Sequence, residues 1–293
     1  MNERYSLIDA EKAEHSVSRM CRWLDVSRSG FYEWQERPPS HTHLRNEQLD
    51  ARITEIFTES DGTYGYRRVH ADLARQGVAA CPELVRSRMR ALDLRPCQPR
   101  PYRPTTTRQG GDPPAPDLLQ RDFTADAPGE KLVGDITYIP SEEGFAYLAT
   151  VIDCCTKECI GYAIADHMRT ALVIDALDMA ARNGRLADGA IFHSDRGSQY
   201  TSEAFAAHAK SLDVRQSMGR TGICFDNAAA ESFNSAVKVE RVNRVIYPTI
   251  DDARKDVTRY IELRYNTRRL HSSLGYRTPR EAYLAYINTL AAA

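Results

Sequence analysis

The sequence predicts a mixed α/β domain that is preceded and followed by helical segments. Three observations lead to this fold class. Segments before residue 95 place apolar residues at helical spacing, residues 131–218 begin with three β-rich runs and continue as alternating helix and strand, and the chain returns to helical spacing after residue 227. A length of 293 residues is in keeping with about two domains.

Composition and charge exclude several classes of protein. The 39 Lys and Arg against 40 Asp and Glu exclude a highly basic protein that coats nucleic acid, but not a local basic patch. No apolar run approaches the roughly 20 residues of a membrane span. Charges in MNERYSLIDAEKAEHS argue against a signal peptide, so we expect a cytoplasmic protein. The seven cysteines show no Cys-x-x-Cys spacing, and we expect reduced thiols without structural zinc.

The first helical segment covers residues 1–38. Val17, Met20, Cys21 and Leu24 lie close to helical spacing, and after a short break Ser27 is a suitable N-cap for a second helix in SRSGFYEW. Two short helices joined by a tight turn resemble a helix-turn-helix.

A second helical module covers residues 39–95. It contains an amphipathic segment, a segment that ends at a glycine and a segment that starts at a proline: LRNEQLDARITEIFTES, GYRRVHADLARQG and CPELVRSRMRALDL. The last segment carries Arg86, Arg88 and Arg90, and a basic helix after a short turn is the expected form of a DNA recognition helix. The alternative is a three-helix bundle with a solvated basic face.

Residues 96–120 read as an extended linker. Seven of the 14 prolines fall in this stretch beside a Gly-Gly pair, so it cannot be a helix or a central strand. It also carries several arginines, among them Arg100 and Arg103, and no acid before Asp112. Two interpretations remain open, a basic strap that follows a DNA backbone and a solvated linker.

The α/β part starts with a meander of three strands and continues as helix, strand, helix and strand. The predicted strands and helices are, in order, EKLVGDITYIP, FAYLATVID, ECIGYAIAD, RTALVIDALDMAARNG, AIFHSD, TSEAFAAHAKSLD and VRQSM. This order predicts a mixed sheet that is covered by helices. Two further helical segments follow, in DNAAAESFNSAVKVERV and DDARKDVTRYIELRYNTR.

Three acids lie on otherwise apolar elements and are candidates for a chemical role. Asp135 lies in the middle of a strand, where Asp is disfavoured, on the same face as Val133. Asp195 follows an apolar run, at the strand end where α/β sheets present ligand-binding groups. Glu231 lies on a predicted helix in one stripe with Asn227 and Lys238.

Carboxylates in such a set suit a divalent metal. Hard oxygen ligands favour Mg²⁺ or Mn²⁺, and two such ions can hold the attacking and leaving oxygens of a phosphodiester. The competing interpretation of any single strand Asp is a structural ion pair or turn, and this is the role that we assign to Asp153 and Asp166.

Four motifs in order extend this interpretation to nearly the whole chain. They are GDITYIP, HSDRGSQYTS, DNAAAESFNSAVKVE and YNTRRLHSSLGYRTPREA, with 35 residues between Asp195 and Glu231. Together they resemble the integrase-core transposases of bacterial insertion sequences, of the OrfB type in the IS-three family, within the retroviral-integrase (DDE) superfamily. GTYGYRRVHADL resembles the helix-turn-helix segment of that family, and SVSRMCRWLDVSRSGFYEW its N-terminal segment. The chain departs from the pattern at Leu132, where Trp is common, and at Ile223, where a polar residue is usual.

The resemblance implies roles for individual residues. Asp135, Asp195 and Glu231 would be the catalytic triad and would bind two Mg²⁺ or Mn²⁺ ions per active site. Lys238 would contact DNA near the element end, and Asn227 would help to shape the site. The other expected DNA contacts lie in the loop after Asp195, in the helical module and in the linker: Arg196, Ser198, Gln199, Arg67, Arg68, Arg86, Arg88, Arg90, Arg100 and Arg103. His193 lies beside the site, and we give it no catalytic role.

The resemblance also implies the fold and the reaction. We expect an RNase H-like integrase catalytic core over residues 121–245 and a C-terminal helical extension over 246–293. The activity would be DNA transposition, in which metal-dependent cleavage at the element ends liberates 3′-hydroxyls that attack another phosphodiester. The expected partners are double-stranded DNA (terminal inverted repeats and target), further copies of the chain, and the product of an upstream reading frame fused to it, in the bacterial nucleoid. Two alternatives stay open: a nuclease of the same fold that joins nothing, and a non-catalytic DNA-binding protein.

Overall fold

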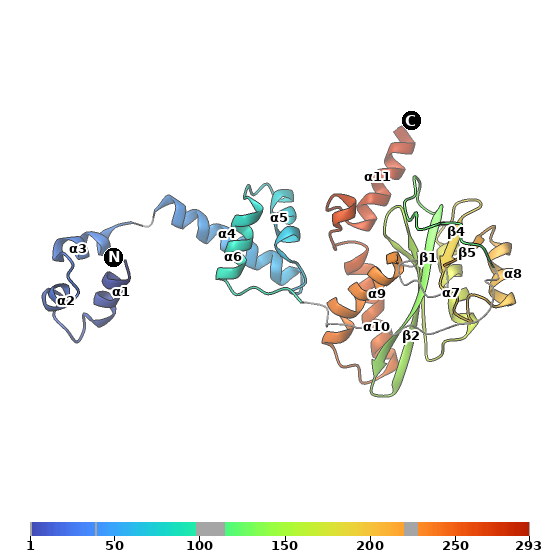
Figure 1. The fold of residues 1–293 in the computed structure, drawn as a ribbon, viewed down its shortest axis with the longest axis horizontal. Helices are drawn as coiled ribbons and strands as arrows, with labels where there is room; N and C mark the ends of the chain where they lie inside the picture. The colour runs from blue at the N-terminus through green and yellow to red at the C-terminus, as the bar shows by residue number, and fades with distance from the viewer. Residues whose placement is uncertain (1, 39, 98–114, 220–227, 293) are drawn as a thin grey trace. The chain divides into compact units, whose positions relative to one another are not determined.

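The computed structural model describes residues 2–38, 40–97, 115–219 and 228–292 (Figure 1). Its contacts divide the chain into two compact units, Met1–Glu55 and Ile56–Ala293. The first unit contains helices α1 (Asn2–Glu11), α2 (Val17–Trp23) and α3 (Arg28–Glu36) and most of α4 (His41–Glu59). Helices α1–α3 share a small apolar core that includes Ile8 and Phe31. The two expected helices are therefore present, with α1 in front of them.

Local signals in the sequence explain where these helices and the next two begin and end. The Ser27 hydroxyl accepts a hydrogen bond from the Gly30 amide at 3.3 Å, so it caps α3 as expected. In the second unit, α5 (Tyr66–Arg75) is followed by Gly77 with a φ of +77°, a conformation that glycine adopts without strain. Helix α6 (Pro82–Ala91) has proline in its first turn. Buried apolar residues join α5 and α6: Val69, Leu73, Val85 and Met89.

The α/β part is built on one five-stranded sheet in the order β3-β2-β1-β4-β5. Its strands are β1 (Lys131–Ser141), β2 (Gly144–Asp153), β3 (Cys159–Ala165), β4 (Ile191–Ser194) and β5 (Arg215–Met218). The first three form the predicted antiparallel meander, and β4 and β5 run parallel to β1. The sheet is therefore the mixed, RNase H-like one that was expected.

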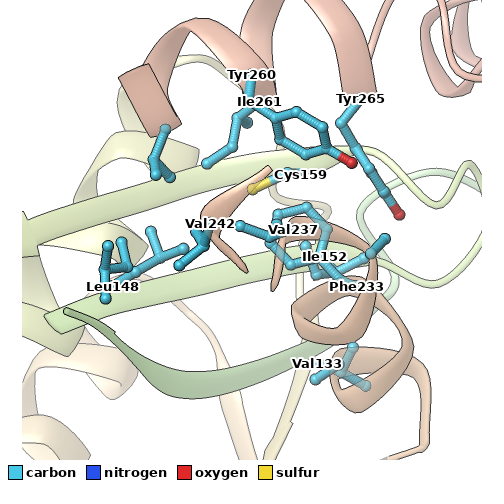
Figure 2. Packing of buried hydrophobic residues seen from close by; sticks show 14 of the residues in the cluster. Val133, Leu148, Ile152, Cys159, Phe233, Val237, Val242, Tyr260, Ile261 and Tyr265 are labelled. Carbon is cyan, nitrogen blue, oxygen red and sulfur yellow. The ribbon is translucent and has the colours of Figure 1, made fainter. Parts of the chain in front are cut away.

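Helices cover both faces of this sheet (Figure 1). Helices α9 (Ala228–Glu240) and α10 (Ile250–Tyr260) lie on one face, and α7 (Thr170–Arg182) and α8 (Glu203–Ser211) lie on the other. Figure 2 shows the first interface, where Val133 and Leu148 of the sheet face the side chains of α9 and of the segment after α10. Leu132 packs in the opposite cluster. The alternation along β1 therefore directs Asp135, in phase with Val133, toward α9.

Gly134 is required by the opposite face of β1. A Cβ atom at this position would lie 2.2 Å from the Phe192 ring of β4. The absence of a side chain lets the two strands pack closely at the point where β1 carries Asp135, so the glycine before the acid is a packing requirement.

The C-terminal extension is helical, as expected, and it holds the α5–α6 module. After α10 come a π-helical turn (Ile261–Tyr265) and helix α11 (Pro279–Ala292). The Tyr64 hydroxyl donates to the Arg268 carbonyl at 2.8 Å, and the Arg68 Nε donates to the Leu270 carbonyl at 3.0 Å. Among the described residues, no helix combines the length and the apolar character needed to cross a membrane.

Candidate active site

Asp135 occupies the middle of β1 and is partly buried against α9. Its Oδ1 accepts a hydrogen bond from the Ile136 amide, and its Oδ2 accepts one from the Asn234 side-chain amide of α9, both at 2.8 Å. These two bonds fix the orientation of the carboxylate. The prediction that this acid lies on the Val133 face of the strand is confirmed.

Asp195 follows directly after β4, at the carboxyl end of a strand that pairs with β1 over Lys131–Val133. It is exposed, and its Oδ1 accepts a hydrogen bond from the Gly197 amide at 2.9 Å. Because β4 ends at Ser194 while β1 continues past Val133, Asp195 emerges next to the part of β1 that carries Asp135.

Glu231 lies in the first turn of α9, where a negative charge interacts favourably with the helix dipole. Asn234, the residue that holds Asp135, lies one turn further along the same helix and is buried. Helix α9 therefore carries Glu231 toward the carboxylate that its own Asn234 holds.

Asp195 and Glu231 both act on the pKa of Asp135. Burial, and next the charge of Asp195, raise the pKa of Asp135 to about 7, and Glu231 adds to the rise. The hydrogen bonds from Ile136 and Asn234 act in the opposite direction and do not offset these effects. Glu231 keeps much of its surface in solvent, but its partial burial raises its own pKa. Such like charges gathered on one sheet face favour a bound cation.

Two polar side chains beside the carboxylates, those of Asn234 and Tyr200, were not identified from the sequence. The Asn234 Oδ1 and the Tyr200 hydroxyl are buried, and neither has a hydrogen-bond partner among the described residues. Burial, followed by the charges of Asp135 and Asp195, raises the pKa of Tyr200 well above its usual range. Asn234 could have been noticed as a polar residue within the buried stripe of α9, since its neighbour Phe233 and Val237 are both apolar and buried.

The donor set fits a hard divalent cation, although not as a closed cage. Within the described ranges, no three His, Cys, Asp or Glu side chains lie close enough together to hold one ion. Mg²⁺ is commonly bound through one or two carboxylates, with water and substrate phosphates completing the shell. The two unpartnered oxygens and the raised pKa of Asp135 are in keeping with such an open site.

Lys238 lies two turns after Glu231 on α9 and is half-buried. Its ammonium nitrogen lies 4.2 Å from the centre of the Tyr138 ring. Burial lowers the pKa of Lys238, and the charge of Asp135 partly opposes that effect, so the two groups are within electrostatic range.

The loop after Asp195 is held by contacts with backbone carbonyls. The Arg196 Nε donates to Gly219 O at 2.8 Å, and the Gln199 amide donates to Met168 O at 2.8 Å. Ser198 between them is exposed. Arg196 and Gln199 thus position the loop, and Ser198 has the accessibility that a DNA contact requires.

In the helical module the expected DNA contacts separate into two groups. Arg67, Arg86 and Arg90 are exposed, and Arg88 is half-buried. Arg86 and Arg90 line a groove of about 650 Å³ together with Tyr66 and Arg95. This groove gives the module a basic surface.

Arg68 is a correction to the expectation. Its Nε donates to the Leu270 carbonyl at 3.0 Å, and its guanidinium lies 3.6 Å from the Glu240 carboxylate. These contacts point the side chain into the protein and make it a structural residue. Arg67, one position earlier on α5, is exposed because the helix turns about 100° per residue.

The remaining sequence predictions have mixed outcomes. Asn227, Arg100 and Arg103 lie outside the described residues. His193 is buried, and its Nδ1 lies 2.8 Å from the Ser217 hydroxyl, so its ring belongs to the packed sheet. Asp153 accepts hydrogen bonds from the Gly129 and Thr156 amides, which confirms its structural role.

Comparison with known proteins identifies matching families for most of the chain. Two models described as integrase core domain match residues 125–224 and 212–279, and a model described as HTH-like domain matches residues 43–102. The chain is similar to the transposase InsF for insertion sequence IS3A of Escherichia coli (strain K12), with 37% identity over 280 residues, 95% of this chain and 97% of the relative.

A second relative and a solved structure complete the comparison. An uncharacterised 31 kDa protein of insertion element IS600 from Shigella sonnei is 37% identical over 267 residues, 90% of this chain and 98% of that protein. The catalytic core domain of HTLV-2 integrase, solved in complex with magnesium, is 14% identical with a TM-score of 0.42. The match covers 54% of this chain and 98% of that core domain.

Proposed function

The chain belongs to the integrase-core transposases of the IS-three (IS3) family, and on this premise we propose that Asp135, Asp195 and Glu231 form its DNA-cleaving and DNA-joining centre. The protein is a polynucleotidyl transferase of an insertion sequence. At the proposed centre it cuts the ends of the element, and the liberated 3′-hydroxyls then attack target DNA. The observation that carries the proposal is that Asp195 and Glu231 both raise the pKa of Asp135, whose carboxylate is held by the Asn234 amide of α9.

The side chains around Asp135 prepare the centre for this chemistry. When bound, two Mg²⁺ or Mn²⁺ ions would polarise the scissile phosphodiester and lower the pKa of the attacking hydroxyl. The Asn234 amide and the Ile136 backbone amide hold Asp135 in one orientation, while the Gly197 amide holds Asp195. A carboxylate that is already fixed loses little side-chain freedom when its ligand arrives.

DNA is proposed to reach the centre along several basic groups. Lys238 lies within electrostatic range of Asp135, so it would supply a cation beside the phosphate that is cut. Ser198, with Arg196 and Gln199, would meet the backbone at the loop after Asp195. Arg86 and Arg90 of α6 would contact the element end through the groove that they border, and Arg88 of α6 and Arg67 of α5 would contribute further contacts. Asn227 remains a proposed contact by family resemblance, and Arg100 and Arg103 remain proposed contacts because a basic, extended strap can follow a DNA backbone.

The wider organisation is also a proposal. We assign residues 1–38 and 39–95 to DNA-binding helical modules, 96–120 to a linker, 121–245 to the catalytic core and 246–293 to the extension. The protein would act on the bacterial chromosome in the cytoplasm, as a homo-oligomer that bridges terminal inverted repeats and target. A fusion with an upstream reading frame would add a further DNA-binding segment.

The test uses purified protein, Mg²⁺ and a labelled duplex that carries the terminal repeat flanking this reading frame. Wild type is compared with Glu231→Gln and with Glu203→Gln, a matched control because Glu203 is an exposed glutamate in the first turn of α8. Shortened and joined strands from wild type and the control, but not from Glu231→Gln, are expected. Full activity of Glu231→Gln would refute the site. Cleavage without joining would favour a nuclease, and binding without cleavage would favour a DNA-binding protein.

A further inference from the structure

Two aromatic rings stay in solvent at the hairpin that joins β1 and β2. Tyr138 is 55% exposed and Phe145 is 51% exposed, and the rings meet edge to face with centroids 5.6 Å apart. Their neighbours Ile139 and Ala146 are fully buried, so the exposure is specific to one face of the hairpin. Large apolar side chains that remain exposed side by side are candidates for a binding surface.

Lys238 connects this aromatic pair to the catalytic centre. The lysine nitrogen lies 4.2 Å from the Tyr138 ring centre, while Asp135 acts on the pKa of the same lysine. Tyr138 follows Asp135 by three residues, which corresponds to about 10 Å along a strand. In a stacked DNA strand, about 10 Å corresponds to roughly three nucleotides.

In the described part of the chain, one edge of β1 is unpaired beyond Val133. Strand β4 pairs with β1 only over Lys131–Val133, and the described residues show no other strand beside β1 on that side. Lys238 reaches past this edge from α9, on the Asp135 face, to Tyr138, which lies out of phase with Asp135. A DNA strand held at Asp135 could therefore send a base around the edge to the aromatic pair.

We propose that Tyr138 and Phe145 form a stacking platform for an unpaired base within about three nucleotides of the scissile phosphate. This inference rests on the proposed function. A nucleobase fits better than a protein partner, because Lys238 places an ammonium at the platform where a phosphate passes, whereas the core of a protein interface is depleted of lysine. Holding the base there separates the strands at the end that is cut.

The experiment combines the Tyr138→Ala change with removal of the base. Cleavage and binding are measured for wild type and Tyr138→Ala on the flanking terminal repeat, with an intact duplex and with duplexes carrying one abasic nucleotide at each of the three positions on either side of the cut. Tyr138→Ala is expected to lose about tenfold in cleavage of intact DNA. At one of these positions, removal of the base should slow cleavage by wild type by a similar factor. The same abasic duplex should slow cleavage by Tyr138→Ala little further, since both changes remove the same contact.

Two further variants separate stacking from other causes. Tyr138→Trp should restore cleavage because it restores a flat ring, and Ile246→Ala should match wild type, since Ile246 is an exposed apolar residue at the start of the C-terminal extension. The proposal would be overturned if, at every abasic position, the reductions in cleavage from Tyr138→Ala and from the missing base multiplied when combined. Unchanged cleavage of intact DNA by Tyr138→Ala would also overturn it. Absence of cleavage by wild type would instead refute the proposed function.

Discussion

Helix α9 carries two glutamates, Glu231 in its first turn and Glu240 at its last residue, and their surroundings differ. Glu240 is buried and lies 2.8 Å from the Arg269 guanidinium, with the Tyr260 hydroxyl donating to it at 2.8 Å. Arg68 of the helical module approaches the same carboxylate at 3.6 Å. Glu231 is exposed and forms no ion pair with any described residue. Within the described part of the chain, arginines pair with Glu240 and no cation pairs with Glu231.

The difference indicates which charges serve the fold and which serve a ligand. A buried carboxylate needs pairing and hydrogen bonds to be tolerated, and Glu240 has both. Asp135 has two hydrogen bonds, but the charges that shift its pKa are those of the acids Asp195 and Glu231, although Lys238 is also within electrostatic range. A carboxylate such as that of Asp135, whose pKa is raised by burial and by neighbouring acids, is typical of a functional site.

The largest expected effect is on DNA cleavage, and it distinguishes Asp135 from Glu240. Asp135→Asn should reduce DNA cleavage by on the order of 10⁴-fold, about 5 kcal/mol, because it removes a charge that the reaction uses. Cleavage rates of the labelled end measure this loss, and circular dichroism checks that the fold is retained. Glu240→Gln serves as the comparison. A Glu240→Gln enzyme that loses as much activity as Asp135→Asn, at equal folding, would remove the distinction.

Stability should show the opposite order. Glu240→Ala leaves Arg269 buried without its partner and should destabilise the protein by about 3–5 kcal/mol. Glu231→Ala, at an exposed position, should change the free energy of unfolding by less than about 0.5 kcal/mol. Urea denaturation of both variants gives the two numbers. Equal destabilisation by the two substitutions would contradict the assignment of Glu240 to structure.

The paired region should also be sensitive to acid. Burial, followed by the charges of Arg269 and Arg68, lowers the pKa of His271 from 6.5 to about 3. The unfolded chain therefore binds a proton that the folded chain does not, and this stability is present above pH 6.5 and falls as the pH drops toward 3. Between pH 7.5 and 5 the loss from this residue should be about 1–2 kcal/mol.

His271→Gln is the control for that loss, since glutamine cannot titrate. The free energy of unfolding of the variant should depend less on pH over the same interval, measured by urea denaturation at each pH. An equally steep pH dependence in the variant would show that His271 is not the group responsible.

The smallest effect concerns Tyr200. Its hydroxyl is buried without a hydrogen-bond partner among the described residues, so Tyr200→Phe should leave metal-free stability unchanged or raise it by up to about 1 kcal/mol. Thermal unfolding of wild type and variant without divalent metal measures the difference. A clear decrease would mean that the hydroxyl is bonded in solution, and the open character of the site would then be less than inferred.

Much of this organisation could be predicted from the sequence, because it depends on local sequence patterns. The alternation along β1 places Asp135 in phase with Val133, and the run before Asp195 marks a strand end. Ser27 marks a helix start through its capping hydroxyl, and Pro82 marks one through its fixed backbone angle.

What could not be predicted depends on contacts between distant segments. Arg67 and Arg68 look alike in the sequence, and only the packing of α5 against the Leu270 segment turns Arg68 toward Glu240. Asn234 becomes a site residue because α9 lies over β1, which brings its amide within 2.8 Å of Asp135. Such pairings follow from tertiary packing and cannot be predicted from the periodicity of a single helix.

The most direct test of the central claim is a titration of the DNA-free protein with Mn²⁺, followed by electron paramagnetic resonance at pH 7.5. Wild type and Glu240→Gln are expected to bind the ion alike, and Asp135→Asn and Glu231→Gln to bind it at least tenfold more weakly. This result would establish that Asp135 and Glu231 bind a cation from solution, whereas Glu240 is already paired within the protein. Undiminished binding by Asp135→Asn and Glu231→Gln would contradict the account.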